Sequence, residues 1–150
     1  MTTYQRILAV LDLASGDEEV ARRALAIAMA AGAAPPTLLH VVEYVPPEPL
    51  NDSLLPAAQL EAELLARARS RMAALAARLG PPVPPWRVAA GNVKNEILRT
   101  AREGGHDLIV IGSHERHGLS ILVNMTEDTV LHGAPCDVLA VRLAAAGRGG

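Results

Sequence analysis

Most of the residues that could do chemistry in this sequence lie in the segment Gly112–Thr126, which begins at the end of the apolar run "DLIVIGS". Gly112 closes that run, and Gly118 and Thr126 come after it. Glycines let backbone N–H groups approach a phosphate, and a hydroxyl at the start of a helix can hold the anion. The segment is therefore typical of a phosphate-binding loop, except that Glu115 and Met125 lie where such a loop needs uncharged, bare backbone.

Two other kinds of site would use neighbouring residues. Ser113, His114 and Asp12 have the residue types of a catalytic triad, but the sequence lacks the GxSxG turn, so we predict no catalytic residues and no enzyme. His114 and His117 form an HxxH pattern, with His132 further along the chain. Because zinc sites need three or four oriented ligands, a histidine-based metal site stays an alternative without assigned ligands.

These residues lie on a chain whose apolar runs alternate with stretches of helical period, which predicts βαβ units and a parallel sheet. Five runs predict strands, over Ile7–Leu13, Thr37–Tyr44, Trp86–Ala90, Asp107–Ser113 and Cys136–Leu143. Prolines close to the third run favour a strand at the edge of the sheet. With right-handed crossovers, this order predicts an α/β fold with one doubly wound parallel sheet and helices on both faces.

Four helices are predicted between the strands. Ser15 and Glu18 form a capping box that starts the first helix, and Asn92 opens the third. The second helix places one apolar stripe toward the sheet, formed by Leu60, Leu64, Ala68, Met72, Leu75 and Leu79. Its arginines are predicted to form a solvated face, with Arg67, Arg69, Arg71 and Arg78. The fourth helix is expected near Thr126–His132, and the proline-rich stretch Val45–Pro56 is expected to be a loop.

The order of these elements also places a site. In doubly wound sheets, ligands bind beyond the carboxyl ends of the strands, where the strand order reverses. This rule brings Asp12, Val41 and the segment Gly112–Thr126 around one crevice. Three separated segments are therefore predicted to converge there.

The composition limits the other classes of function. At 150 residues, 50% of them hydrophobic, the chain has the length of one domain with its own core. A net charge of −2, with one Trp, two Tyr and no Phe, gives neither a basic field nor a stacking surface for nucleic acid. The lone Cys136 excludes an internal disulfide. Since no secretory signal or long apolar span is present, we expect a cytoplasmic protein without membrane contact.

Four stretches taken together resemble the universal stress protein family: "ILAVLDLAS", "LLHVVE", "GNVKNEILRTAREGGHDLIVIGSH" and "VLHGAPCDVLAV". The resemblance runs from Gln5 to Arg142, so we expect one such domain over residues 1–143 and a disordered tail over residues 144–150. It implies a five-stranded sheet of order 3-2-1-4-5, of the adenine-nucleotide alpha-hydrolase-like kind. It also implies a cytoplasmic homodimer, joined along the last strand, and leaves any further protein partner unidentified.

Members of this family that bind ATP carry GxxG after the fourth strand, then a longer spacer, then Gly with Ser or Thr. Gly112 matches the first glycine of this motif. Glu115 replaces the second glycine, Asn124 the third, and Met125 the hydroxyl residue. The resemblance therefore implies a nucleotide site whose phosphate loop has departed from the family pattern.

Two hypotheses follow from this resemblance. The first is a non-enzymatic, homodimeric stress-response module with a degenerate nucleotide-binding loop and no resident cofactor. The second is an ATP- or AMP-binding regulator, in which the first-strand aspartate faces ribose or metal and the second-strand valine meets adenine. The residues of that crevice would be Asp12, Val41, Gly112, His114, Gly118 and Thr126.

Overall fold

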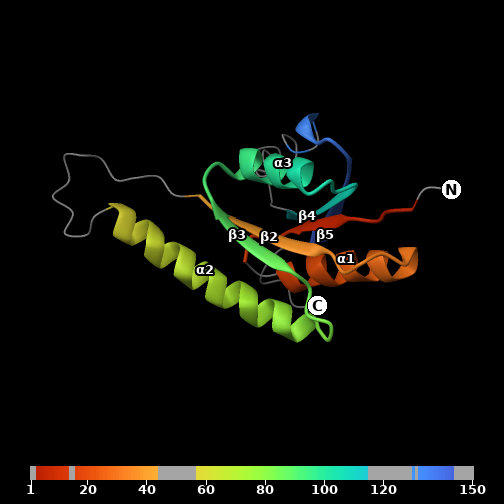
Figure 1. Ribbon diagram of the computed structural model, residues 1–150, viewed down its shortest axis with the longest axis horizontal. Coiled ribbons are helices and arrows are strands. Elements are labelled where there is room, and N and C mark those ends of the chain that lie inside the picture. Colours follow the sequence, from red (N-terminus) through yellow and green to blue (C-terminus); the bar gives the residue numbers. More distant parts are fainter. Residues whose placement is uncertain (1–2, 14–15, 44–56, 115–129, 131, 144–150) are drawn as a thin grey trace.

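Five parallel strands form one sheet in the order β3-β2-β1-β4-β5 (Figure 1). The structure, a computed structural model, describes residues 3–13, 16–43, 57–114, 130 and 132–143. The strands are β1 Ile7–Val10, β2 Thr37–Val42, β3 Trp86–Ala90, β4 Leu108–His114 and β5 Asp137–Leu143. The predicted strand order 3-2-1-4-5 is confirmed. The order reverses beside β1, which lies between β2 and β4.

Helices cover both faces of the sheet, as predicted. Figure 1 shows α1 (Asp17–Ala31) and α2 (Ala57–Leu79) on one side of the sheet and α3 (Val93–Glu103) on the other. Each face has its own apolar core, one shared by α1, α2 and alternate residues of the strands, the other by α3 and the remaining residues. All four residues of β1 are buried, because this central strand is covered on both faces.

The long helix α2 packs on the sheet through the predicted stripe. Ala68, Met72 and Leu75 are buried in the core that α2 shares with α1, and Leu79 packs against it. The proline-flanked strand β3 is an edge strand, as predicted, and Trp86 at its start is half-buried against the same core. The aliphatic periodicity of the sequence therefore places the helices correctly.

The predicted start of α1 is wrong. The residue that caps this helix is Gly16, with a φ of 97° and no side-chain cap hydrogen bond, in place of the predicted Ser15, which lies outside the described residues. The Glu18 carboxylate instead accepts hydrogen bonds from Arg22 of the same helix and Arg78 of α2. The predicted start of α3 is confirmed, since the Asn92 side chain accepts a hydrogen bond from the Asn95 N–H at 2.9 Å.

The first two strands are shorter at their carboxyl ends than predicted. β1 ends at Val10 and β2 at Val42, so the chain leaves the sheet before the predicted ends at Leu13 and Tyr44. The expected loop over 45–56, most of the fourth helix and the tail over 144–150 lie outside the described residues. Within the described ranges, no helix is long and apolar enough to cross a membrane.

Candidate functional site

The candidate site lies at the carboxyl ends of β1, β2 and β4. The last paired residue of β1, Val10, lies opposite Leu39 of β2 and Ile111 of β4, and Asp12 follows two residues later. Val41 and Ser113 come two residues after these partners on the neighbouring strands. The predicted convergence of the first, second and fourth strands is therefore consistent with the strand register.

The two side chains predicted to meet a nucleoside differ in exposure. Asp12 is exposed at the end of β1. Val41 is only 7% exposed and packs in the α3 core. Val41 therefore presents little surface to a ligand.

Gly112 has a packing role that the sequence did not indicate. A Cβ at this position would lie 2.9 Å from Leu143 Cδ1 and 3.1 Å from Val20 Cγ2. The same Leu143 methyl lies 2.9 Å from the position of a Cβ on Gly16. Leu143 of β5 thus fills the space between two glycines and packs β5 against the start of α1. The absence of a side chain at Gly112 serves this packing, whether or not a phosphate approaches its backbone.

Several of the predicted site residues cannot be placed. His114 ends β4, but its side chain lies outside the described part of the structure, together with Gly118 and Thr126. The three departures from the family motif, Glu115, Asn124 and Met125, also lie outside it. Within the part of the chain that is described, no three histidine, cysteine or acidic side chains come together as a metal site.

Sequence analysis missed Asp17, the first residue of α1. Only 7% of it is exposed, although it is an acid. Its Oδ1 accepts a hydrogen bond from the backbone N–H of Asp12 at 3.1 Å. Its Oδ2 is buried and has no hydrogen-bond partner among the residues that the structure describes. Asp17, on which the sequence analysis made no prediction, therefore lies beside Asp12 in the candidate site.

The environment of Asp17 favours its neutral form. Burial, and after it the neighbouring Asp12 carboxyl, raise the pKa of Asp17 to about 8. Two close carboxyl groups cannot both ionise at low cost when one of them is buried, so a proton stays between them. At neutral pH the start of α1 therefore carries a protonated acid next to the exposed Asp12.

Leu13, one residue after Asp12, adopts a left-handed backbone conformation with a φ of 59°. This conformation costs a residue with a Cβ roughly 1–2 kcal/mol, and for a bulky side chain it is uncommon. It turns the chain away from β1, and the Leu13 side chain is buried in the core beneath α1 and α2. The turn that carries Asp12 is therefore strained and needs contacts that hold it.

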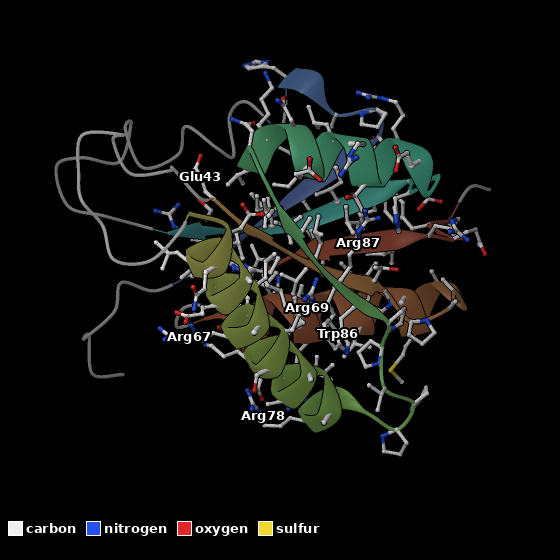
Figure 2. All side chains as sticks on the ribbon, turned by 60° about the vertical axis from the view of Figure 1, so that its left-hand side comes forward. Glu43, Arg67, Arg69, Arg78, Trp86 and Arg87 are labelled. Atoms are coloured by element: carbon white, nitrogen blue, oxygen red, sulfur yellow. The ribbon has the colours of Figure 1, made fainter. Side chains whose placement is uncertain are left out.

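Two of the arginines predicted to form a solvated face also contact this region. Arg71 donates a hydrogen bond to the Leu13 carbonyl oxygen, and Arg78 donates to Glu18 Oε1 at 3.2 Å. A hollow of about 250 Å³ lies between α2 and the start of α1, and both arginines line it with Asp17 and Glu18. Figure 2 shows Arg67, Arg69 and Arg78 along α2. Arg71 and Arg78 are exposed, as predicted for a solvated face, but their guanidinium groups also reach the turn after β1 and the start of α1.

Comparison with known proteins agrees with the fold. The family model for the "Universal stress protein family" matches residues 3–142. The chain belongs to the universal stress protein family. Within that family, "Universal stress protein A homolog 2" of Coxiella burnetii is 36% identical over 144 residues, or 95% of this chain and 98% of that protein.

Solved universal stress proteins share the fold. The universal stress protein UspA from Lactobacillus plantarum is 25% identical, with a TM-score of 0.69, over 95% of this chain and 100% of that chain. A universal stress protein solved in complex with cAMP is 23% identical, with a TM-score of 0.57, over 93% of this chain and 98% of that chain. The described strands and helices are therefore those of a universal stress protein domain.

Proposed function

We propose that this universal stress protein is a non-enzymatic, cytoplasmic stress-response module that acts as a homodimer. Its crevice would hold the nucleoside part of an adenine nucleotide through Asp12 and the backbone around it. Its phosphate loop would be degenerate, so that ATP binds no more tightly than adenosine does. The mechanism is binding and signalling, without turnover.

The observation that carries the nucleoside part is the position of Asp12 just after β1, where the strand order reverses between β2 and β4. Asp12 is exposed there. A carboxylate accepts hydrogen bonds from hydroxyl groups, so ribose hydroxyls suit it. Because the Val41 side chain is mostly buried, adenine would contact only the edge of this side chain and the neighbouring backbone.

The residues that follow β4 support the degenerate phosphate loop. Glu115 puts a carboxylate where the family has glycine, and Met125 removes a hydroxyl. A carboxylate about 4 Å from a phosphate oxygen costs roughly 1 kcal/mol per charge pair in water and about 4 kcal/mol at an effective dielectric constant of 20. Against several phosphate charges, this repulsion offsets much of the roughly 8 kcal/mol of micromolar binding.

The second candidate is an ATP- or AMP-binding regulator that uses the same crevice. It is favoured by Gly112 at the first glycine of the motif, and Gly118 and Thr126 would complete the loop. The packing of Gly112 against Leu143 weakens this support, because it explains the glycine without a phosphate. cAMP is a further ligand to test, since a solved protein of the same fold binds it.

Calorimetric titration of the nucleotide-stripped protein with adenosine, AMP, cAMP and MgATP separates the two candidates. We expect the affinity to stay level or fall as phosphates are added. ATP that binds in the micromolar range, and about tenfold or more tightly than adenosine, would establish the regulator instead. If none of the four ligands binds at millimolar concentration, the nucleoside site is wrong as well.

A loop variant tests the cause of the weak phosphate binding. The triple substitution Glu115→Gly, Asn124→Gly and Met125→Ser restores the family motif and is expected to raise ATP affinity without changing adenosine affinity. The matched control is Asp12→Asn, which is expected to weaken adenosine and ATP equally. If the triple variant binds ATP no better than the wild type, the proposed loop defect is incorrect.

The homodimer is tested separately. Strand β5 is an edge of the sheet, and an open edge can pair with the same strand of a second copy. Light scattering after size exclusion is expected to give twice the chain mass of 15.8 kDa. A single species at the chain mass over a wide range of concentrations would exclude the dimer.

A further inference from the structure

The backbone of the turn after β1 is held by side chains from three different elements. The carbonyl oxygen of Leu11 lies 2.7 Å from His40 Nδ1 of β2. The next N–H group, of Asp12, donates to Asp17 of α1 at 3.1 Å. The carbonyl oxygen of Leu13 accepts a hydrogen bond from a guanidinium of α2. Three consecutive residues therefore each have one backbone polar group bound by a side chain from outside β1.

The guanidinium of α2 belongs to Arg71, and its position in the chain differs from that of the other two partners. His40 and Asp17 follow directly from the strand pairing and from the helix that begins after the turn. Arg71 is 58 residues away in sequence from Leu13. Its contact therefore exists only because α2 packs on β2 and β3, with the buried Ala68 and Met72 before and after the arginine in the helix.

The contact is at the residue where the backbone is least favourable. Leu13 has a positive φ of 59°, which is uncommon and costly for a residue with a bulky side chain, so the turn needs contacts that hold it. A hydrogen bond from a charged donor to the Leu13 carbonyl oxygen stabilises the observed conformation. The packing of α2 does not depend on this bond, since its apolar stripe is buried without the arginine.

We propose that Arg71 is a positioning residue for the nucleoside crevice, and that its hydrogen bond to the Leu13 carbonyl oxygen fixes the turn that presents Asp12 to ribose. The proposal rests on the proposed function for the ligand, but the hold on the turn is a property of the free protein. Arg71 does not touch the ligand in this account. It acts through the backbone of Leu13.

Arg71→Ala and Arg71→Lys, with Arg69→Ala as the matched control, test the proposal. Arg69 is an exposed arginine of the same helix, two positions away. The first readout is amide hydrogen exchange of the free, full-length protein. We expect the Asp12 N–H to exchange about fivefold to tenfold faster in Arg71→Ala, the net contribution of one ordinary intramolecular hydrogen bond, while the Leu8 and Val110 amides of the central strands keep their rates. Arg71→Lys, which keeps one donor, is expected to restore part of the protection.

The second readout is adenosine affinity by calorimetry, expected to fall by the same factor in Arg71→Ala and to be unchanged in Arg69→Ala. Unchanged exchange at Asp12 in Arg71→Ala overturns the proposal. So does faster exchange of Asp12, Leu8 and Val110 by one common factor, because that result means a loss of overall stability. If wild-type protein binds no adenosine but Asp12 alone exchanges faster, the proposed function fails and the hold of Arg71 on the turn is supported.

Discussion

The two ends of the sheet both use an aspartate to bind backbone N–H groups, and they do so in opposite ways. At the amino ends, Asp107 accepts hydrogen bonds from the N–H groups of Gln5 at 2.8 Å and Arg6 at 3.0 Å, one with each oxygen. At the carboxyl ends, Asp17 accepts one N–H, from Asp12, and leaves its other oxygen buried without a partner among the described residues. Both oxygens of Asp107 accept a hydrogen bond, whereas only one oxygen of Asp17 does so among the described residues.

The difference separates stability from function within one sheet. The amino ends are closed by ordinary contacts, such as the bond from Arg6 Nε to the Gly104 carbonyl oxygen at 2.6 Å. The carboxyl ends collect a strained Leu13, a buried acid and an exposed Asp12. Unfavourable local arrangements of this kind persist where a fold also binds ligands, and the carboxyl ends are where doubly wound sheets bind them.

The largest expected effect comes from Asp17→Asn, measured as stability against pH. The unfolded chain releases the Asp17 proton near the ordinary pKa of 3.8, while the folded protein keeps it up to about 8. The stability from this group is therefore complete below about pH 4 and is lost as the pH rises toward 8, by up to about 1.4 kcal/mol per pH unit. Urea unfolding from pH 5 to pH 8 should show that the free energy of unfolding of Asp17→Asn rises relative to that of the wild type at each step.

The difference between the two proteins is the quantity to follow, because His106 titrates with the opposite sign. Burial, and after it the Arg6 charge, lower the pKa of His106, so its contribution to stability is lost as the pH falls below the ordinary value of 6.5. This contribution is the same in both proteins and cancels. If the difference in free energy of unfolding between Asp17→Asn and the wild type does not change with pH, the proposed contrast between the two ends of the sheet is wrong.

The next effect is expected at the amino ends, from Asp107→Ala. The variant loses the acceptors for the Gln5 and Arg6 N–H groups, at a cost of about 2 kcal/mol in the free energy of unfolding. The control Asp107→Asn keeps one acceptor oxygen and should lose about half as much. Adenosine affinity, measured by calorimetry, should not change in either variant. Weaker adenosine binding would mean that the two ends of the sheet are not independent.

The smallest effect is expected from Gly112→Ala, about 1 kcal/mol of lost stability through overpacking against Leu143. Leu143→Val removes the methyl groups nearest to the new Cβ, so the double variant should lose less than the two single variants added together. Chemical denaturation of the four proteins measures this coupling. Strict additivity of the two losses of stability would show that Gly112 is not a packing glycine. The role of a phosphate-loop glycine would then be favoured for it.

The sequence predicted the fold well because its signals are local. The aliphatic runs gave five parallel strands, the apolar stripe placed α2, and prolines placed β3 at an edge. Asn92 was correctly predicted as a cap because its partner lies three residues away. The start of α1 was wrong for a related reason: Glu18 has a local capping pattern, but Arg78 of another helix provides a competing partner.

The candidate site was predicted only in outline. Asp12, Val41 and Gly112 lie at the predicted end of the sheet, and His114, Gly118 and Thr126 remain predictions for residues whose side chains lie outside the described part. Asp17 and Arg71 were missed, since no spacing in the sequence shows that an acid will be buried or that an arginine will reach a carbonyl 58 residues away.

The sequence by itself determined which segments form strands and helices and which side chains face the core, because hydrophobic period depends on neighbours along the chain. Only the tertiary structure decided the state of the site. The packing of α2 on β2 and β3 brought Arg71 to the Leu13 carbonyl oxygen, and the left-handed turn at Leu13 brought Asp17 against Asp12. The burial of Asp17 and its proximity to the Asp12 carboxyl arise only in the folded chain, and they set the protonation of this site.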